Sequence, residues 1–557
     1  MTKGFREVRR YRSVLLGLAV LTLLSGRAVA DTIEVENWAS YTSPNFRIYS
    51  NAASERAIEL TYSLERFRGA FEQLAPELEL RSPVPTRILA FRDEESYAPF
   101  KSGRDRDDAR ILGQFLGHRD GNFITLNADP RFLSGLGVVY HEYVHYFVQH
   151  NLPTVPRWFN EGLAEYYSTF ATDAEAAVVG LPVERHLTWI RTHDELGLAG
   201  LLESGGHTDE RHRAGQVGQF YAVSWGLVHY LFSSDIERAG QLAEFFERTA
   251  QGEEPVRAFE SALDTKIGDL EKALKAYFLG ATLPAARIGL DRLDGAIDVR
   301  VEGTAPSDLF SLLGDLVVRQ GLEQRAETLY SLSLAHDPDH AEAHAGLAFV
   351  RDLQSRLEEA EVLYRQALEM GPRQARSYLL YGRHLLARLP GAREEGGVEA
   401  AAALAEAAQL AFAQAADLDP EFAETHAMLG YSHLFTPGDA ARGIAPLEKA
   451  QKLLPGRSDV VFHLLQLHLK LGHFDRAREL TNGVLARIGG EDVVYRANEE
   501  IERASLIRAA NEALREGRHE EGLRFLDNAI AVTSDPQVRA ELERELHSLE
   551  ARLPSSP

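Results

Sequence analysis

The pattern of apolar and polar positions divides the chain into two parts. Over residues 31–285, short segments that alternate between apolar and polar residues are interspersed with segments of helical periodicity. Alternation predicts strands, here at 46–49 and 123–126, because successive side chains of a strand point to opposite faces. Apolar residues at a period near 3.6 predict helices, among them 136–150 and 157–170. We therefore expect an α+β domain in this part of the chain.

From about residue 307 the pattern becomes helical throughout, and it recurs with a period near 34 residues. The segments 307–340 and 341–374 share Leu, a small residue, Ala, Tyr and Pro at repeat positions 7, 8, 20, 24 and 32. Small residues allow two helices to approach closely, and the proline ends the second helix of a unit. This pattern resembles the tetratricopeptide repeat (TPR) family, whose units are antiparallel helix pairs stacked into a superhelix.

The TPR resemblance implies an all-α solenoid of about six repeats over residues 307–540. Residues 286–306 are then a linker to the α+β domain, and 541–557 are a C-terminal tail. Solenoid domains present extended concave surfaces to other molecules. The resemblance therefore also implies a protein partner bound through the TPR domain.

Residues 1–30 have the three parts of a signal peptide. Basic residues from Lys3 to Arg12 precede the apolar stretch Val14–Leu24, which is too short for an ordinary transmembrane helix. Ala28–Ala30 reads Ala-Val-Ala and matches the A-x-A cleavage pattern. We expect an exported protein, most simply in a bacterial periplasm, with secretion or an N-terminal anchor as alternatives. After cleavage of the leader we expect no stable membrane insertion.

Charge and cysteine content narrow the functional classes. The formal net charge is −23 at pH 7, and such acidity argues against nucleic acid as a main partner because phosphate backbones are repelled. The chain contains no cysteine, so it has no disulfide and no thiolate metal ligand. Any zinc site must therefore use histidine and carboxylate.

Residues of this kind occur in the predicted helix 136–150. His141-Glu142-Tyr143-Val144-His145 has the H-E-x-x-H pattern of zinc metallopeptidases. On a helix, His141 and His145 lie one turn apart on the same face, so both imidazoles can bind one metal ion. Glu142 then lies beside the metal, where its carboxylate can take a proton from a bound water. A surface helix with incidental histidines is the alternative interpretation.

A second motif lies in the next predicted helix, where Asn160–Glu165 reads N-E-G-L-A-E. Together, the two motifs resemble the gluzincin metallopeptidases, and in particular the peptidase MA-like family. That resemblance implies a zincin-like catalytic domain that binds one zinc ion.

The roles of single residues follow from the same resemblance. His141, His145 and Glu161 are the expected zinc ligands, and Glu142 is the expected catalytic base. Glu165 corresponds to a carboxylate that orients a ligating histidine. The spacing from His145 leaves open an exchange of roles between Glu161 and Glu165.

Two further features concern the substrate. Tyr221 is the candidate for stabilising the oxyanion of the reaction, with a packed core aromatic as the alternative. The predicted strand at 122–127 directly precedes the motif helix. It is a candidate edge strand that pairs with an extended peptide, with an ordinary sheet strand as the alternative.

The leading hypothesis is an exported zinc metallopeptidase whose TPR domain recruits a peptide substrate or a partner protein. The alternative is a non-catalytic scaffold of the cell envelope that carries a peptidase-like domain. The chain contains no G-x-M-E-N motif, which argues against aminopeptidase activity.

Overall fold

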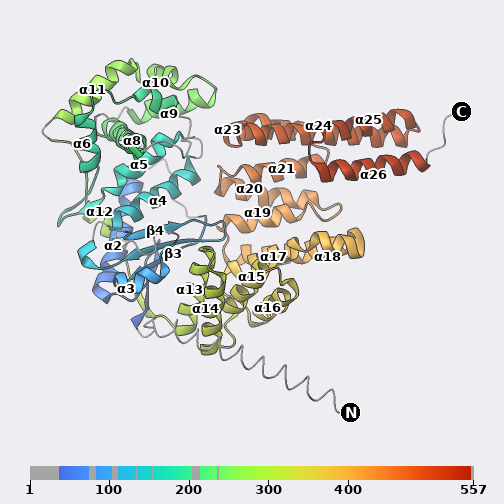
Figure 1. The fold of residues 1–557 in the computed structure, drawn as a ribbon, viewed down its shortest axis with the longest axis horizontal. Helices are drawn as coiled ribbons and strands as arrows, with labels where there is room; N and C mark the ends of the chain where they lie inside the picture. The colour runs from blue at the N-terminus through green and yellow to red at the C-terminus, as the bar shows by residue number, and fades with distance from the viewer. Residues whose placement is uncertain are drawn as a thin grey trace, which may run out of the picture. The chain divides into compact units, whose positions relative to one another are not determined.

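The computed structural model describes residues 37–74, 83–102, 111–132, 135–152, 155–203, 214–234, 238–280, 282–295 and 297–552. The predicted signal peptide at 1–30 lies outside these residues. The chain forms two compact units, Met1–His384 and Leu385–Pro557 (Figure 1). No helix within the described part of the chain is long and apolar enough to cross a membrane.

The first unit contains a six-stranded sheet with the strand order β4-β5-β3-β2-β1-β9. β2, β3 and β5 run parallel to one another, and the other neighbours are antiparallel. The strands are β1 (Ala39–Thr42), β2 (Arg47–Ser50), β3 (Thr86–Phe91), β4 (Gly113–Leu116), β5 (Asn122–Asn127) and β9 (Arg300–Gly303). The predicted edge strand at 122–127 is therefore an interior strand, because β4 lies outside it.

Side chains of β3 alternate between two separate apolar cores, one on each face of this sheet. Ile88 and Ala90 belong to the larger core, whereas Leu89 and Phe91 belong to the second core. Neither face is left to solvent, because all four side chains are completely buried. Burial on both faces explains why the last four residues of β3 are all apolar, as is usual for parallel strands that are covered on both sides.

Most helices of the first half of the unit cover the larger core, whereas the short helix α3 (Glu94–Tyr97) contributes Tyr97 to the second core. α5 packs against both α4 and α8, and α4 also contacts the edge strand β4. The helices are α2 (Ser54–Leu74), α3 (Glu94–Tyr97), α4 (Gly135–Asn151), α5 (Arg157–Ser168), α6 (Glu184–Thr192), α7 (Leu198–Glu203), α8 (Ala214–Ser234), α9 (Arg238–Ala250), α10 (Pro255–Leu263) and α11 (Ile267–Leu279). A three-stranded sheet of β6 (Ala171–Thr172), β7 (Ala176–Val179) and β8 (Ala286–Gly289) completes this part.

Residues 286–306 do not form the predicted linker. β8 pairs antiparallel with β7, and β9 pairs antiparallel with β1. Between them, Asp294 at the end of α12 (Asp291–Asp294) accepts two hydrogen bonds from Arg66, at 2.6 and 2.7 Å. The segment is therefore built into both sheets of the unit, which no local sequence pattern indicated.

The second face of the large sheet is covered by the first repeat helices. α13 (Pro306–Arg319), α14 (Glu323–His336) and α15 (Ala341–Leu353) contribute to the second core. Leu309, Leu313 and Leu316 of α13 are completely buried in that core together with Phe91 and Phe123 of the sheet. The start of the repeats is consequently part of the first unit and not a separate domain.

A group of buried charges also joins the sheet to these helices. Asp120, in the turn before β5, accepts hydrogen bonds from Arg319 at 3.1 Å and from Arg376 at 2.8 Å. Asp315 accepts from Arg376 at 2.8 Å and from Arg87 of β3 at 3.2 Å. We call these five residues the interface charge cluster. Removal of one member takes an ion-pair partner away from buried charges of the cluster, which is destabilising.

Within each unit, most helices from α13 onward pack against the next helix in the sequence, as expected for a TPR-like solenoid. Tyr330 lies at the contact of α13, α14 and α15, where a Cβ atom on Gly314 or Gly346 would come within 2.7 or 2.3 Å of its ring. The remaining helices are α16 (Leu357–Met370), α17 (Ala375–Ala387), α18 (Leu389–Leu418), α19 (Ala423–Ser432), α20 (Ile444–Leu453), α21 (Ser458–Lys470), α22 (Phe474–Glu479), α23 (Ala486–Ile488), α24 (Gly490–Arg515), α25 (His519–Val532) and α26 (Pro536–Arg552).

The predicted C-terminal tail at 541–557 is helical over most of its length, because α26 continues to Arg552. Leu542 of α26 is buried in a small core with Leu526 and Ala529 of α25. The helix therefore covers the apolar side of the last pair, as a terminal capping helix of a solenoid does.

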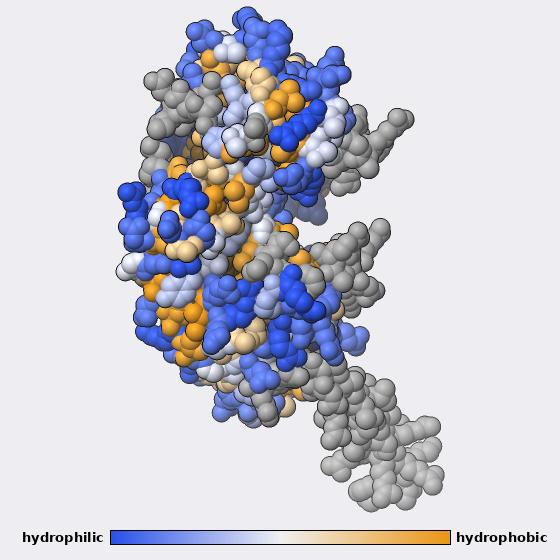
Figure 2. All heavy atoms as spheres, turned by 90° about the vertical axis from the view of Figure 1, so that its left-hand side faces the viewer, coloured by the Kyte–Doolittle hydropathy of each residue, from blue (hydrophilic) through white to orange (hydrophobic). Residues whose placement is uncertain are grey.

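On the face of the molecule shown in Figure 2, hydrophilic side chains surround smaller hydrophobic areas. Large apolar side chains such as Val138, Leu181 and Leu279 are exposed by 36 to 64 %. Apolar side chains of this kind are a normal part of a folded surface and do not by themselves mark an interaction site.

Candidate metal centre

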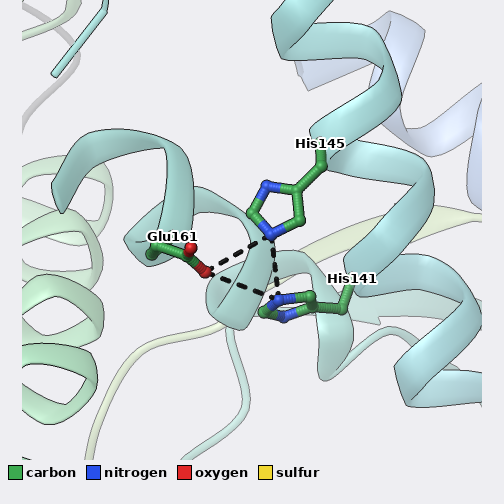
Figure 3. A group of neighbouring side chains, drawn as sticks. All are labelled: His141, His145 and Glu161. Carbon is green, nitrogen blue, oxygen red and sulfur yellow. Dashed lines mark hydrogen bonds and ion pairs between the residues drawn. The ribbon is translucent and has the colours of Figure 1, made fainter. Parts of the chain in front are cut away.

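Two histidines of α4 lie one helical turn apart and face α5. The Nε2 atoms of His141 and His145 are 3.0 Å apart (Figure 3). One face of α4 is apolar, and its residues Val139, Val144 and Phe147 are buried in the larger core. The two histidines lie on the opposite face of the helix. The helical spacing predicted from the sequence therefore brings both ring nitrogens to one point.

Glu161 of α5 completes the group. Its Oε2 atom lies 3.3 Å from His145 Nε2 and 3.7 Å from His141 Nε2. Among the described residues, this is the one group of three His, Asp or Glu side chains with ligand atoms all within 4.8 Å of one another. We call it the ligand group.

The neighbouring Gly162 explains how α5 reaches this position. A Cβ atom at Gly162 would lie 2.4 Å from the Ser224 carbonyl oxygen of α8. Any larger residue would push α5 away from α8. The glycine of the N-E-G motif thus allows the close packing that fixes Glu161 beside α4.

The three ligand atoms fit a single metal ion. Ligand atoms that lie 2.0–2.1 Å from a tetrahedral zinc ion are about 3.3 Å apart, and the observed separations of 3.0, 3.3 and 3.7 Å bracket this value. Glu161 Oε2 is also buried without a hydrogen-bond partner. A buried carboxylate oxygen of this kind is costly unless a cation balances it.

Asn160 sets the tautomer of one histidine. Its Oδ1 atom lies 2.9 Å from Nδ1 of His145, and an amide oxygen only accepts hydrogen bonds. Nδ1 of His145 therefore carries the proton, and the lone pair of Nε2 is directed toward the ligand group. The sequence predicts no role for Asn160, although it belongs to the N-E-G motif.

Charge interactions within the ligand group shift the pKa of its carboxylate. Burial would raise the pKa of Glu161, but the contacts with His141 and His145 outweigh it and lower the pKa to about 2. Burial would lower the pKa of His145, but the nearby Glu161 carboxylate and the contact with Asn160 raise it. The carboxylate is therefore ionised at neutral pH, as a metal ligand must be.

Glu142 lines a cleft beside the ligand group. The cleft has a volume of ≈ 970 Å³, within the range of about 300–1,000 Å³ that is usual for ligand sites. His141, Glu165, His186, Trp189 and Tyr221 line the same cleft. Glu142 is half-buried and accepts no hydrogen bond from another described residue, so its carboxylate is available to a bound molecule.

Glu165 does not orient a ligating histidine, contrary to the role that the resemblance implied. Its Oε1 atom accepts a hydrogen bond from Arg185 at 2.8 Å, and its Oε2 atom lies 3.2 Å from His186 Nε2. Burial would raise the pKa of Glu165, but His186 and Arg185 lower it. The orienting contact within the ligand group comes from Asn160 instead.

Tyr221 is placed near the group, on α8. It is half-buried and lines the cleft together with His141 and Glu142. Burial raises the pKa of its hydroxyl, and the negative charge of Glu161 raises it further. The hydroxyl therefore keeps its proton at neutral pH and can donate a hydrogen bond into the cleft.

Comparisons with known proteins found similar solved structures, several of them described as TPR proteins. No protein-family model matches the chain, and no curated protein matches it significantly. Among solved structures, YrrB, described as a TPR protein with an unusual peptide-binding site, is 16 % identical over 34 % of this chain and 90 % of its own, with a TM-score of 0.29. PilF from Pseudomonas aeruginosa is 22 % identical over 43 % of this chain and 97 % of its own, with a TM-score of 0.29.

A TPR protein from Thermus thermophilus gives a similar result, with 20 % identity over 35 % of this chain and 98 % of its own and a TM-score of 0.28. Such scores are too low to carry an argument about this chain. The TPR-like solenoid is therefore established by the chain's own helix pairs and its recurring Tyr, Gly and Ala positions.

Proposed function

We propose that the chain is a metal-dependent hydrolase that cleaves peptide bonds. The observation that carries this proposal is the ligand group, in which His141, His145 and Glu161 place three ligand atoms at separations suited to one ion. The catalytic domain is then zincin-like in fold and of gluzincin type in its ligands. These residues leave one tetrahedral position for water or substrate, as in catalytic zinc sites.

Zinc is the proposed ion. When bound, it lowers the pKa of a water molecule toward neutrality and polarises a carbonyl group. The same set of two histidines and one carboxylate also binds iron(II) in other enzymes, so the metal content of the purified protein is itself a test of the proposal.

Glu142 is the proposed general base. Its carboxylate lines the cleft next to His141, accepts the proton of the attacking water and returns it to the leaving amine. Tyr221 has its proton at neutral pH and is proposed to donate a hydrogen bond to the oxygen that becomes negative during the reaction. His145 is held in its orientation by Asn160 throughout.

The substrate is proposed to be an extended peptide. β4 is the strand at the edge of the sheet and contacts α4, which carries the histidines. An edge strand has backbone groups that can pair with another chain. Gly113–Leu116 therefore replaces 122–127 as the candidate for substrate pairing.

The Glu142→Gln variant tests the mechanism. We expect it to retain stoichiometric metal, measured by mass spectrometry of the purified protein, and to cleave a quenched fluorescent peptide library about 10²–10⁴-fold more slowly. Glu184→Gln is the matched control, since Glu184 lines the same cleft away from the ligand group. Equal cleavage by the wild-type and Glu142→Gln proteins would exclude this function.

The second candidate function is a non-catalytic interaction scaffold that acts through its TPR-like helices. The observation that favours this function is the run of repeat helices from α13 onward, because solenoids of helix pairs present extended surfaces to other proteins. Metal content separates the two candidates. A purified protein that contains no zinc and binds none tightly would leave the scaffold as the function.

We also propose that one exported protein combines peptide cleavage in the first unit with protein binding through the repeat helices. The predicted signal peptide supports export, most simply to the periplasm, and the helices beyond the first unit offer a surface for a substrate or partner protein. A fusion of residues 1–36 to a reporter enzyme that is active only outside the cytoplasm tests export. Reporter activity is expected, and a cytoplasmic reporter would contradict it.

A further inference from the structure

The second unit contains a groove with an unusual charge. The groove has a volume of ≈ 910 Å³ and is formed by α18, α19, α21, α22 and α24 together with the turn after α21. Its basic residues are Arg393, Lys470, Arg503, Arg508 and Arg515, whereas Glu500 and Glu512 are its acidic residues. The chain as a whole has the opposite balance, with 83 acidic and 60 basic residues.

Two of these arginines are neutralised within the unit. Arg503 lies 2.6 Å from Glu500, and Arg508 lies 3.0 Å from Glu512. Both acidic residues of the groove are thus already paired. The charge of the groove is decided by the basic residues that remain.

Arg393, Lys470 and Arg515 have no carboxylate partner within the described residues. Arg393 and Arg515 are exposed at the groove. Lys470 donates a hydrogen bond to the Leu434 carbonyl oxygen, and burial lowers its pKa. Three cations without carboxylate partners thus line one groove and give it a net positive charge, which attracts anionic ligands.

The groove also offers apolar contacts between these charges. Tyr431, Phe435 and Phe474 line it with their rings, and Leu434 and Ile507 add aliphatic surface. Arg508 lies over the ring of Phe474, 5.5 Å from its centroid. Aromatic residues next to cations suit a ligand that carries both apolar side chains and carboxylates.

We propose that this groove binds an acidic peptide segment, in which carboxylates meet Arg393, Lys470 and Arg515 and an apolar side chain lies between the aromatic rings. The volume accommodates a few residues of an extended chain and not a folded partner. Nucleic acid is the less favourable polyanion, because the surrounding acidic surface repels a long phosphate backbone. The proposal rests on the repeat helices as an interaction module and does not depend on metal chemistry.

The test measures binding of a fluorescein-labelled peptide, Gly-Asp-Phe-Asp-Leu-Asp-Gly, by fluorescence anisotropy. The full-length Glu142→Gln protein is used, so that any cleavage of the probe is suppressed and failure of the metal mechanism cannot affect the result. We expect saturable binding that weakens with increasing salt. The same peptide with Asn in place of each Asp should bind at least about 10-fold more weakly.

Groove variants then locate the binding. Arg393→Gln and Arg515→Gln should each raise the Kd roughly 3- to 10-fold, and the double variant more, because each change removes one exposed cation without breaking an internal ion pair. Arg544→Gln is the matched control, an exposed arginine of α26 outside the groove. Far-ultraviolet circular dichroism checks that the helices are retained.

Three outcomes would overturn the proposal. They are absence of saturable binding up to millimolar peptide, equal binding of the neutral peptide, and an unchanged Kd in the double variant. Tighter binding of a single-stranded oligonucleotide of equal charge than of the acidic peptide would assign the groove to nucleic acid instead.

Discussion

The two faces of the six-stranded sheet both carry groups of acidic and basic side chains, but these groups differ in burial and in pairing. In the ligand group the side chains are exposed by 14 to 23 %, and Glu161 Oε2 lacks a hydrogen bond. In the interface charge cluster, Asp120, Asp315, Arg319 and Arg376 are exposed by 2 to 9 % and their carboxylates are paired with arginines.

This difference in burial and pairing distinguishes a candidate binding site, the ligand group, from a purely structural contact, the interface charge cluster. A carboxylate that has an open position beside a cleft can take a metal ion and a substrate. A carboxylate enclosed between arginines has no free position and can only hold together the elements that carry its partners. Charged residues near a sheet therefore do not by themselves indicate a binding site. Their burial and their ion-pair partners must also be known.

The largest effect is expected from removal of the helices that cover the second face. A chain ending after residue 306 exposes Trp38, Phe91 and Phe123 together with the rest of the second core. Burial of a large apolar side chain contributes roughly 1.5–3 kcal/mol, so the loss is on the order of the whole stability of a domain.

We expect this truncated chain to aggregate or to lose its near-ultraviolet circular dichroism. A chain ending after residue 387 retains α13–α17 and is the matched control, which should unfold cooperatively. A soluble and cooperatively folded 1–306 chain would show that the repeats are an independent domain.

The next largest effect concerns the interface charge cluster. Asp315→Asn leaves Arg87 without its carboxylate partner and Arg376 with Asp120 alone, and it should lower the free energy of unfolding by about 3–5 kcal/mol. Asp269→Asn removes an exposed ion pair with Lys272 and should cost less than about 1 kcal/mol. Urea unfolding measures both. Equal stability of the two variants would show that the interface charge cluster contributes no more to stability than an exposed ion pair.

The two glutamates of α5 should differ in metal binding. Glu161→Ala removes a ligand atom and should weaken zinc binding by at least about 100-fold, whereas Glu165→Ala leaves the ligand group intact. Competition with a chromophoric chelator gives both affinities. Loss of zinc from Glu165→Ala but not from Glu161→Ala would reverse the assignment.

A smaller effect is expected from the residue that orients His145. Asn160→Ala removes the acceptor of the Nδ1 proton and should weaken zinc binding roughly 10- to 100-fold without removing a ligand. Asn160→Asp keeps an acceptor and should restore most of the affinity. If the alanine variant binds zinc like the wild type, the contact has no influence on the site.

The smallest expected effect is a pH dependence of the stability that the interface charge cluster contributes. Burial would raise the pKa of Asp315, but Arg376, Arg87 and Arg319 lower it below the ordinary value. A carboxyl group whose pKa is lower in the folded state stabilises the fold above its unfolded pKa, about 3.9, and this contribution is lost as the pH falls below that value. Thermal unfolding measured between about pH 2 and 5 should therefore show a steeper loss of stability below about pH 4 in the wild type than in Asp315→Asn.

The features of the molecule that depend on local periodicity could be predicted from the sequence. The H-E-x-x-H pattern placed His141 and His145 on one helical face, and the structure has both on α4 with their Nε2 atoms adjacent. The repeated Tyr, Ala and Gly positions indicated helix pairs, and Tyr330 is enclosed by Gly314 and Gly346 as that pattern requires. The sequence does not decide between Glu161 and Glu165 as the third ligand, because the spacing from His145 allows an exchange of their roles.

By itself, then, the sequence determined the helices, the motif face and the repeat period, since each depends on residues a few positions apart. Only the tertiary structure decided which glutamate turns toward the histidines, because this depends on the close approach of Gly162 to Ser224. It also decided that β9 pairs with β1 and that Arg376 reaches Asp120. These contacts join residues more than two hundred positions apart, and no local pattern of apolar and polar positions records such a distance.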